Sequence, residues 1–351
     1  MSARLPGDKP AQTKRTVTKM ARPTDRKTRA LGLCSGGLDS MLAALVLREQ
    51  GIEVQWICFE TPFFSADKAR QAARQTGVDL AIEDITPVYL DMLRNPPAGY
   101  GKYMNPCMDC HTLMFKLAGE RMKSEGYDFL FSGEVLGQRP MSQTTSSLSY
   151  VEKHSGLRGY ILRPLSARLL AETLPEQQKL VDRQRLLGLS GRGRKDQIRI
   201  AARFGISTYP TPAGGCLLTD RGYSRRLRDL FDHQDRYNRS DLDLLKFGRH
   251  LRLSPSAKLI VARNQRENEQ ISAYVDLDRH ITLKVIEHPG PQAVLVGRHR
   301  QTVIPRAAAI CTGYSKASGL ERVSVSVRFN NGAQTIEVAP IRPAAVADLL
   351  L

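Results

Sequence analysis

The fold is decided by a short stretch near the N-terminus, residues 31–40, which reads LGLCSGGLDS. Its first residues form an apolar run typical of a strand, and the apolar residues 41–47 (MLAALVL) predict a helix. Gly36 and Gly37 carry no Cβ, so the backbone N–H groups of the turn can approach an anion closely. The positive end of the predicted helix faces the same anion. This stretch therefore predicts a strand–loop–helix unit that binds a pyrophosphate group.

The polar side chains of the loop fit the same ligand. Ser35 and Ser40 supply hydroxyl donors, and Asp39 can hold the Mg²⁺ that accompanies a nucleoside triphosphate. No lysine follows the glycines, which excludes the GxxxxGK[ST] loop of phosphate-transferring ATPases. The alternative for this stretch is a glycine-rich turn without a ligand. The order of strand, loop and helix favours the binding site.

Bulk properties indicate an intracellular enzyme that acts on a nucleic acid. The 351 residues suffice for two domains, and a formal net charge of +17 with a pI near 9.8 favours a polyanionic partner such as RNA. Six unevenly spaced cysteines do not form a secreted disulfide framework. No apolar run reaches the roughly 18 residues that cross a bilayer, and the N-terminus has no hydrophobic signal core. We therefore expect a cytoplasmic protein with no membrane partner.

Composition divides the chain into three parts. Residues 1–28 are polar and basic, and together with Arg29 they hold nine Lys and Arg against two Asp, so we expect an arm that is disordered on its own. Residues 29–240 alternate strand and helix patterns, which predicts an α/β, Rossmann-like parallel sheet covered on both faces. Residues 241–351 carry Val, Ile and Thr segments between polar turns, which predicts a smaller C-terminal α+β domain with an antiparallel sheet.

Individual elements follow from the same patterns. In the α/β part the predicted strands are 30–34, 54–60, 79–85, 128–132 and 160–164. The predicted helices there are 38–50, 65–76, 108–124, 173–187 and 194–204. In the C-terminal part the predicted strands are 258–262, 280–286, 293–296, 322–328 and 335–339.

Three cysteines lie in settings that suit chemistry. Cys107 and Cys110 stand at CxxC spacing in NPCMDCH, before a helical pattern, and Cys216 ends the segment AGGC. The positive end of a helix lowers the pKa of nearby thiols, which favours the thiolates that bind metals. Three alternatives stay open: a Cys₃His zinc site that includes His111, a catalytic dithiol without metal, and a [4Fe–4S] cluster with one iron free of protein thiolate. The other cysteines are expected to be small core residues: Cys34, Cys58 and Cys311.

The C-terminal part has a basic segment, FGRHLRL, followed by the turn ARN. This pairing resembles the NFACT-R type of RNA-binding domain, in which a GRHFR-like segment and a GRN-like turn recur, and the match covers roughly residues 245–320. The alternative is a solvated basic face. The basic side chains expected to contact RNA phosphates are Arg249, His250, Arg252, Arg263 and Arg298.

The α/β part resembles the PP-loop ATP pyrophosphatases, and among them the tRNA thiouridine synthetases. SGGLDS, the NPCMDC segment, FSGEVLGQRPMSQT (131–144) and LRPL (162–165) carry the resemblance. The SGE–LGQ–SQT pattern is similar to 4-thiouridine synthetases of the ThiI type, and NPxxxC is similar to 2-thiouridine enzymes of the MnmA type. The three-cysteine set is like that of the iron–sulfur-dependent members. The chain departs from the ThiI type in showing no THUMP-like or rhodanese-like segment, so the C-terminal module is expected to dock the tRNA.

The resemblance implies ATP-dependent tRNA thiolation. A uridine carbonyl oxygen is adenylated and then replaced by sulfur, with 4-thiouridine favoured and AMP and pyrophosphate released. The implied cofactors are ATP, Mg²⁺ and a [4Fe–4S] cluster, and the implied partners are tRNA and a sulfur donor, either free sulfide or a cysteine desulfurase. A homodimer is one expected assembly. The implied catalytic residues are Asp39, Cys107, Cys110 and Cys216, of which the three cysteines hold the cluster. The implied ATP contacts are Ser35, Gly36, Gly37, Asp39, Ser40, Phe59, Gly133 and Glu134.

Other functions compete with this interpretation. A PP-loop amide ligase would need no set of three cysteines. A sulfurtransferase acting on another, smaller acceptor would leave the net charge of +17 unexplained. A catalytically inactive RNA-binding protein is disfavoured because SGGLDS is intact. For Gln138 and Gln143, as for Gly133 and Glu134, contact with the nucleotide or the target base competes with a purely structural role in helix capping.

Overall fold

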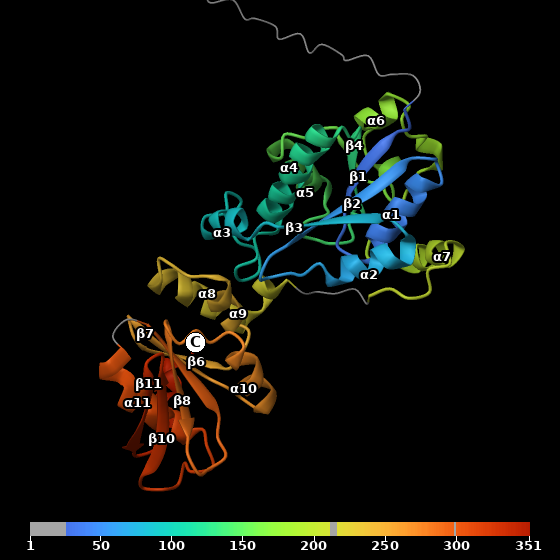
Figure 1. Ribbon diagram of the computed structural model, residues 1–351. Helices are drawn as coiled ribbons and strands as arrows, with labels where there is room; N and C mark the ends of the chain where they lie inside the picture. Colours follow the sequence, from blue (N-terminus) through green and yellow to red (C-terminus); the bar gives the residue numbers. More distant parts are fainter. Residues whose placement is uncertain (1–25, 211–215, 298–299) are drawn as a thin grey trace, which may run out of the picture.

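The computed structural model describes residues 26–210, 216–297 and 300–351, and in its first part the chain forms a five-stranded parallel sheet (Figure 1). The strand order is β3-β2-β1-β4-β5, which confirms the predicted Rossmann-like sheet. The order reverses between β1 and β4, the point at which open parallel sheets bind ligands. The strands are β1 (Arg29–Leu33), β2 (Glu53–Glu60), β3 (Asp79–Asp84), β4 (Phe129–Ser132) and β5 (Ile161–Leu162).

Helices cover both faces of this sheet, because its strands are apolar on both sides. Trp56 and Ile57 follow each other on β2, and each is fully buried in a different core cluster. The helices of one face are α1 (Leu38–Arg48), α2 (Asp67–Thr76) and α7 (Lys195–Arg203). Those of the other face are α3 (Thr86–Arg94), α4 (Cys107–Glu125) and α5 (Thr145–His154). Among the described residues, no helix has both the length and the apolar character that crossing a membrane requires.

The prediction of one continuous helix over 173–187 is wrong. The chain there forms one turn, α6 (Leu174–Gln177), followed by a short 3₁₀ turn, Arg183–Arg185. Lys179 lies between them with φ +55°, a left-handed conformation that a continuous helix cannot include. Ion pairing from Arg183 to Glu176, at 2.5 Å, holds the resulting compact loop. Local polar contacts therefore override the helical pattern in this segment.

The C-terminal part is a six-stranded antiparallel sheet in the order β11-β10-β8-β9-β7-β6, as expected for the α+β domain. Helix α11 (Arg300–Gly313) packs Ala307, Ala308 and Ile310 into its core. The sheet has one strand more than predicted, since the basic segment itself is a strand. The strands are β6 (Arg249–Ser254), β7 (Ala257–Val261), β8 (His280–Val285), β9 (Gln292–Gly297), β10 (Val323–Phe329) and β11 (Gly332–Val338). A further helix, α10, is Gln265–Ser272.

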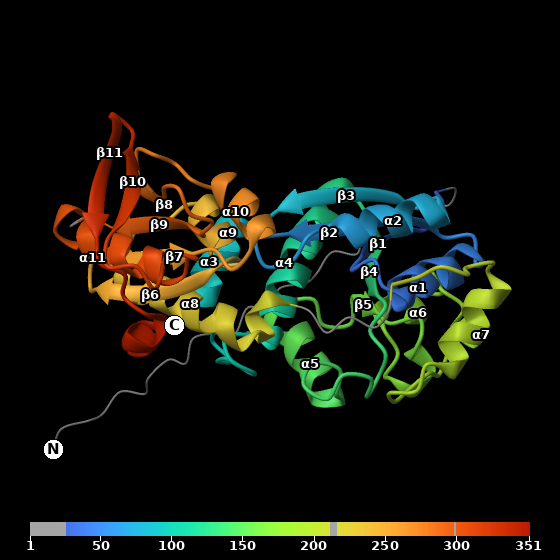
Figure 2. The same ribbon diagram turned by 90° about the horizontal axis from the view of Figure 1, so that it is seen from below.

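Two helices that were not predicted, α8 (Arg221–His233) and α9 (Arg239–Leu244), lie between the two sheets (Figure 2). Leu227 and Leu230 of α8 join the same core cluster as the side chains of α3 and α4. Asp229, also on α8, faces the antiparallel sheet instead, where it accepts two hydrogen bonds from Arg252, at 2.9 and 2.5 Å, and lies 3.4 Å from Lys258. Helix α8 thus joins the two parts of the protein, and the expected boundary near residue 240 falls within α9.

Replacing Asp229 with alanine is expected to lower the free energy of unfolding by about 3 kcal/mol or more. The carboxylate is 6% exposed, and its loss leaves the cations of Arg252 and of the equally buried Lys258 without their partner. Urea denaturation measures the change. The matched control is Lys258→Met, which keeps the Asp229–Arg252 pair and removes a buried charge, so we expect a change of less than about 1 kcal/mol or a gain. Equal urea midpoints for Asp229→Ala and the wild type would contradict the assignment.

Candidate active site

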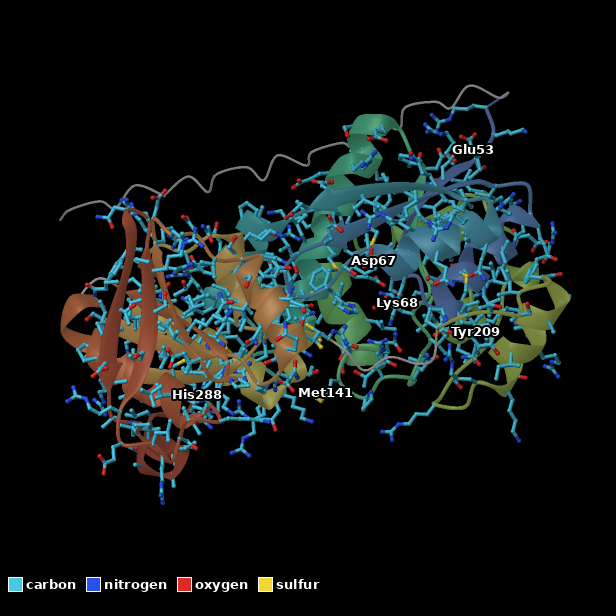
Figure 3. The ribbon with its side chains drawn as sticks, turned by 60° about the horizontal axis from the view of Figure 1, so that its bottom comes forward. Glu53, Asp67, Lys68, Met141, Tyr209 and His288 are labelled. Atoms are coloured by element: carbon cyan, nitrogen blue, oxygen red, sulfur yellow. The ribbon has the colours of Figure 1, made fainter. Side chains whose placement is uncertain are left out.

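The SGGLDS loop connects β1 to α1 at the carboxyl edge of the parallel sheet. Gly36 has φ +71°, and a Cβ there would lie 2.1 Å from the backbone carbonyl carbon of Lys68, so only glycine fits. Lys68 stands with Asp67 at the start of α2, beside the loop (Figure 3). Gly37 is the N-cap of α1 and has no side chain with which to cap the first N–H groups of the helix. Those groups suit an anion such as pyrophosphate.

Asp39 lies in the first turn of α1, and only one of its two carboxylate oxygens accepts a hydrogen bond. Its Oδ2 accepts a 2.8 Å hydrogen bond from Gln138, whose own side-chain oxygen accepts from Gln197 at 3.1 Å. Its Oδ1 is buried without a hydrogen bond, and the nearest cation, Arg194, is 3.9 Å away. A buried carboxylate oxygen without a donor fits a bound Mg²⁺. Gln138, which was a candidate for contact with nucleotide or base, contacts Asp39 in this structure.

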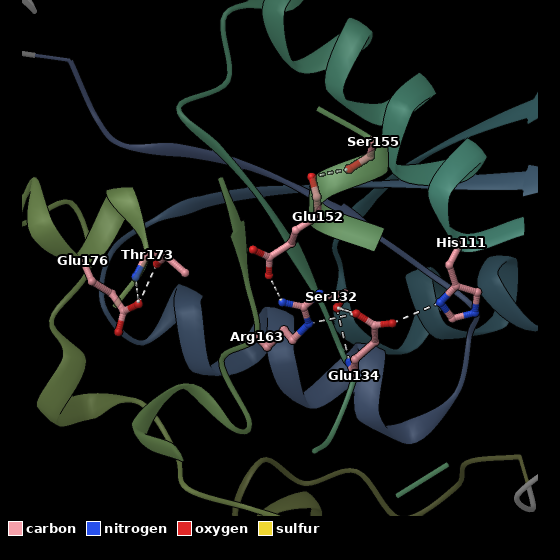
Figure 4. A network of polar contacts seen from close by, with 8 residues as sticks. All are labelled: His111, Ser132, Glu134, Glu152, Ser155, Arg163, Thr173 and Glu176. Atoms are coloured by element: carbon pink, nitrogen blue, oxygen red, sulfur yellow. Dashed lines mark hydrogen bonds and ion pairs between the residues drawn. The ribbon is translucent and has the colours of Figure 1, made fainter. Parts of the chain in front are cut away.

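The segment after β4 connects the loop to the cysteine-bearing helix. A Cβ on Gly133 would lie 2.5 Å from the backbone of Asp39, so the glycine lets this segment pack directly on the start of α1. The next residue, Glu134, binds His111 of α4 at 3.0 Å (Figure 4), and His111 directly follows Cys110 in the chain. Two adjacent residues therefore contact the phosphate-type loop and the thiol-bearing helix.

Both carboxylate oxygens of Glu134 accept hydrogen bonds from other side chains of the protein. It accepts hydrogen bonds of 3.0 Å from Ser132, His111 and Arg163, and Arg163 in turn donates to Glu152 at 2.5 Å (Figure 4). Burial alone would raise the pKa of Glu134, but Arg163 and His111 lower it to about 2. The side chain of Glu134 thus positions neighbouring groups. Phe59, another expected ATP contact, is 4% exposed and packs in the core below the site.

The three candidate cysteines lie in one region. Cys107 and Cys110 occupy the first and fourth positions of α4, and Cys216 packs with Cys110 against the same core cluster. The prediction that the helix end lowers the thiol pKa is wrong for Cys110. Burial raises the pKa of Cys110 to about 12 and that of Cys216 to about 11, and the other thiols nearby add to the rise. These thiols are protonated at neutral pH, and a metal would have to displace their protons. Cys34, Cys58 and Cys311 are buried, as expected.

A tyrosine that the sequence did not single out completes this region. Tyr89 of α3 is fully buried against Phe63 and Phe64, and its hydroxyl faces the Cys110 sulfur without an oxygen or nitrogen partner. Burial raises its pKa well above 10, and the nearby sulfurs of Cys110 and Cys216 raise it further. A buried donor among three thiols fits a sulfur-rich group bound to them. No set of three metal-binding side chains in the described ranges already surrounds a single ion position, and the residues that precede Cys216, 211–215, lie outside those ranges.

The basic residues expected to bind RNA differ in how deeply they are buried and in the groups that they contact. His250 is fully buried, and its Nε2–H donates to Phe247 O at 2.9 Å, so no phosphate can reach it. Burial, with Lys258 and Arg226 nearby, holds its pKa well below 6.5. Arg252 pairs with Asp229, as described above. Arg263 is 46% exposed and bonds Glu267 at 2.7 Å, and Arg249 lies half-buried over the ring of Tyr314. These two can still face RNA, whereas Arg298 is outside the described residues.

A doubly wound parallel sheet with SGGLDS at its switch point defines the PP-loop class of nucleotide-binding domains. Residues 26–168 match the family described as thiamine biosynthesis protein (ThiI), and residues 248–349 match the NFACT protein RNA binding domain. The chain therefore carries a ThiI-type domain followed by a domain of the NFACT RNA-binding type. This confirms the resemblance inferred from the sequence.

Three relatives match the α/β part of the chain. The chain is 28% identical over 167 residues to a probable tRNA sulfurtransferase of Caldanaerobacter subterraneus, covering 45% of this chain and 42% of that one. It is 28% identical to a tRNA sulfurtransferase of Desulfurococcus amylolyticus, with 48% and 34% covered, and 27% identical to the tRNA-specific 2-thiouridylase MnmA of Trichlorobacter lovleyi, with 49% of each covered. The chain spans less than half the length of these three relatives.

Solved structures are more distant. A predicted subunit of tRNA methyltransferase from Methanocaldococcus jannaschii superposes with a TM-score of 0.33 at 16% identity, over 50% of this chain and 76% of the other. The C-terminal part of a fibronectin/fibrinogen-binding protein from Streptococcus suis gives 0.26 at 13% identity, over 70% and 95%. At this level of similarity neither structure bears on the function.

Proposed function

We propose that the protein is a tRNA sulfurtransferase that adenylates a uridine carbonyl oxygen and replaces it with sulfur. The contact made by two adjacent residues carries the proposal: Gly133 packs on the start of α1 at Asp39, and Glu134 binds His111 beside Cys110. The reaction needs ATP and sulfur at the same base, and this contact joins the loop that suits ATP to the helix that bears two thiols. The named relatives support the same activity.

The chemistry follows from the groups at the loop. A uracil carbonyl oxygen is a poor leaving group, so it first attacks the α-phosphate of ATP, which forms the adenylated base and expels pyrophosphate. Ser35, Gly36 and Gly37 would bind the departing pyrophosphate through N–H and hydroxyl groups, and Asp39 would hold Mg²⁺, which offsets the negative charge. The hydroxyl and the N–H of Ser40, another expected contact, both donate to Gly37 O, at 2.7 and 3.1 Å, so Ser40 closes the loop in this structure. Sulfur then attacks the activated carbon, and the original oxygen leaves in AMP. We favour the O4 position and hence 4-thiouridine.

The cysteines supply the sulfur side of the reaction. Cys107, Cys110 and Cys216 would hold a [4Fe–4S] cluster, which leaves one iron able to bind sulfide from free sulfide or from a cysteine desulfurase. Soft thiols suit zinc and an iron–sulfur cluster alike, and the resemblance to the iron–sulfur-dependent thiouridine synthetases favours the cluster. Tyr89 would donate to a sulfur bound there, and Glu134 fixes the ring of His111, the residue after Cys110. The alternative source is a persulfide on one of the cysteines.

The C-terminal domain is assigned to tRNA docking, in the cytoplasm where tRNA is modified, and the protein acts as a monomer or homodimer. Its match to the NFACT RNA-binding domain supports this role. Among the described residues, exposed Arg263 and half-buried Arg249 are the candidate phosphate contacts that remain, and Arg298, outside them, stays a candidate. Phosphate contacts release counterions, so affinity for tRNA falls steeply with salt.

Product analysis tests the proposed function. Protein purified without oxygen is incubated with unmodified tRNA, ATP, Mg²⁺ and sulfide, and we expect AMP, pyrophosphate and 4-thiouridine in equal amounts. Nucleotides are separated by chromatography, and modified nucleosides are identified by mass spectrometry. A reaction without tRNA is the control. Release of ADP and phosphate would refute the PP-loop chemistry, and thiolation at O2 would refute only the choice of position.

A further inference from the structure

The loop that leads into the cysteine helix carries an exposed, strained tyrosine. Lys102 and Asn105 close a turn through a 3.2 Å backbone hydrogen bond, and Tyr103 occupies its second position with φ +59°. A bulky side chain pays a steric penalty there, whereas glycine would not. The Tyr103 ring is 41% exposed, so burial in the core does not explain it.

The loop is tied to both thiol-bearing segments. The N–H of Met104, itself 2% exposed, donates to Leu218 O at 3.3 Å, two residues after Cys216. Tyr103 is also four residues before Cys107, at the start of α4. Anchored by Met104, the turn presents the Tyr103 ring to solvent beside the region that contains the three thiols.

One basic group lies close to this ring, and another lies near the same loop. The Nζ of Lys102 is 5.5 Å from the centre of the Tyr103 ring. Arg228 of α8 is exposed and close to Tyr100, a second exposed tyrosine of the same loop: burial raises the pKa of the Tyr100 hydroxyl, and the Arg228 charge opposes the rise. Exposed aromatic rings among cations are how proteins bind unpaired nucleotides, with bases stacked on rings and phosphates on cations.

We propose that Tyr103 stacks on an unpaired tRNA base next to the target uridine, while Lys102 and Arg228 bind the flanking phosphates. This role of Tyr103 rests on the proposed tRNA thiolation and adds to it a residue that holds the substrate. Because α8 also contacts the C-terminal sheet through Asp229, the RNA would run from that domain across Arg228 to Tyr103 and the thiols. Base stacking on Tyr103 then holds the target uridine near both the loop and the cysteines.

Binding of labelled, unmodified tRNA to the full chain at fixed salt tests the proposal. Tyr103→Ala and Tyr103→Gly should each raise the Kd about tenfold or more, and Tyr103→Phe should leave it within about twofold, since the ring does the stacking. Tyr103→Gly should melt at a higher temperature than Tyr103→Ala, because glycine adopts φ +59° without strain. If Tyr103→Gly melts at the higher temperature and still binds tRNA more weakly than the wild type, misfolding does not explain the weaker binding.

Two further variants complete the test. Tyr160, 39% exposed and placed before β5 at the opposite edge of the parallel sheet, is the matched control, and Tyr160→Ala should bind tRNA like the wild type. In Tyr103→Trp the new indole should be quenched by tRNA, while the one native tryptophan, Trp56, is fully buried. An unchanged Kd for Tyr103→Ala in a protein that thiolates tRNA overturns the stacking role alone. A wild type that binds tRNA through Tyr103 but makes no thiouridine overturns the proposed function alone, and one that binds no tRNA overturns both.

Discussion

Asp39→Asn is expected to slow the formation of AMP and pyrophosphate by roughly 10²- to 10³-fold. The substitution keeps the shape of the side chain and an oxygen that can accept from Gln138, but it removes the negative charge at Oδ1, which has no donor in the structure. Without that charge Mg²⁺ is held less well, and the negative charge on departing pyrophosphate is less offset. Pyrophosphate release in the presence of tRNA measures the effect.

The matched control for Asp39→Asn is Asp67→Asn. Asp67 also lies in the first turn of a helix of the same domain, but its carboxylate is 80% exposed and contacts Ser65 and Arg70. We expect pyrophosphate release by Asp67→Asn to match that of the wild type, and both variants to melt near the wild-type temperature. If Asp39→Asn retained pyrophosphate release within about twofold of wild type, Asp39 would have no role in ATP cleavage.

The architecture was predictable because its signals are local. Strand β1, the loop and α1 follow each other within twenty residues, and alternating patterns placed the other four parallel strands within a few residues of their observed bounds. The failures arise where a local backbone turn or a distant contact overrides the residue pattern. Nothing in the pattern of 173–187 signals the left-handed Lys179, and α8 is amphipathic toward two different partners, the core of the α/β domain and Arg252 of the antiparallel sheet.

The site was predictable in its residue types but not in its contacts. Sequence spacing and resemblance indicated the three cysteines, and they do lie in one region, yet burial reverses the pKa shift expected from the helix end for Cys110. Arg252 has the same local sequence signal as a phosphate contact, and only the fold reveals Asp229 as its partner, 23 positions earlier in the chain. Tyr89 lies in an ordinary apolar pattern, and nothing local distinguishes it from a core residue.

Cys216→Ala is expected to reduce tRNA thiolation to background and to remove iron and acid-labile sulfide from protein reconstituted without oxygen. A set of two cysteines leaves a second iron of the cluster without a thiolate, and such a cluster is not retained. The adenylation half-reaction depends on the loop at α1, so tRNA-dependent pyrophosphate release should persist in the variant. Loss of sulfur chemistry with retained ATP cleavage would separate the two halves of the site. Iron analysis, the broad visible absorption of the cluster and pyrophosphate release are the three measurements.

The control for Cys216→Ala is Cys311→Ala. Cys311 is another buried thiol, but it packs in the core of the antiparallel sheet, so its loss should leave iron content and thiolation unchanged. Cys107→Ala and Cys110→Ala should behave as Cys216→Ala does, because each removes one of three ligands. Wild-type protein that holds one zinc and no iron would refute the cluster and favour the Cys₃His site with His111. Full iron content in Cys216→Ala would instead exclude Cys216 as a ligand and leave it as the carrier of a persulfide.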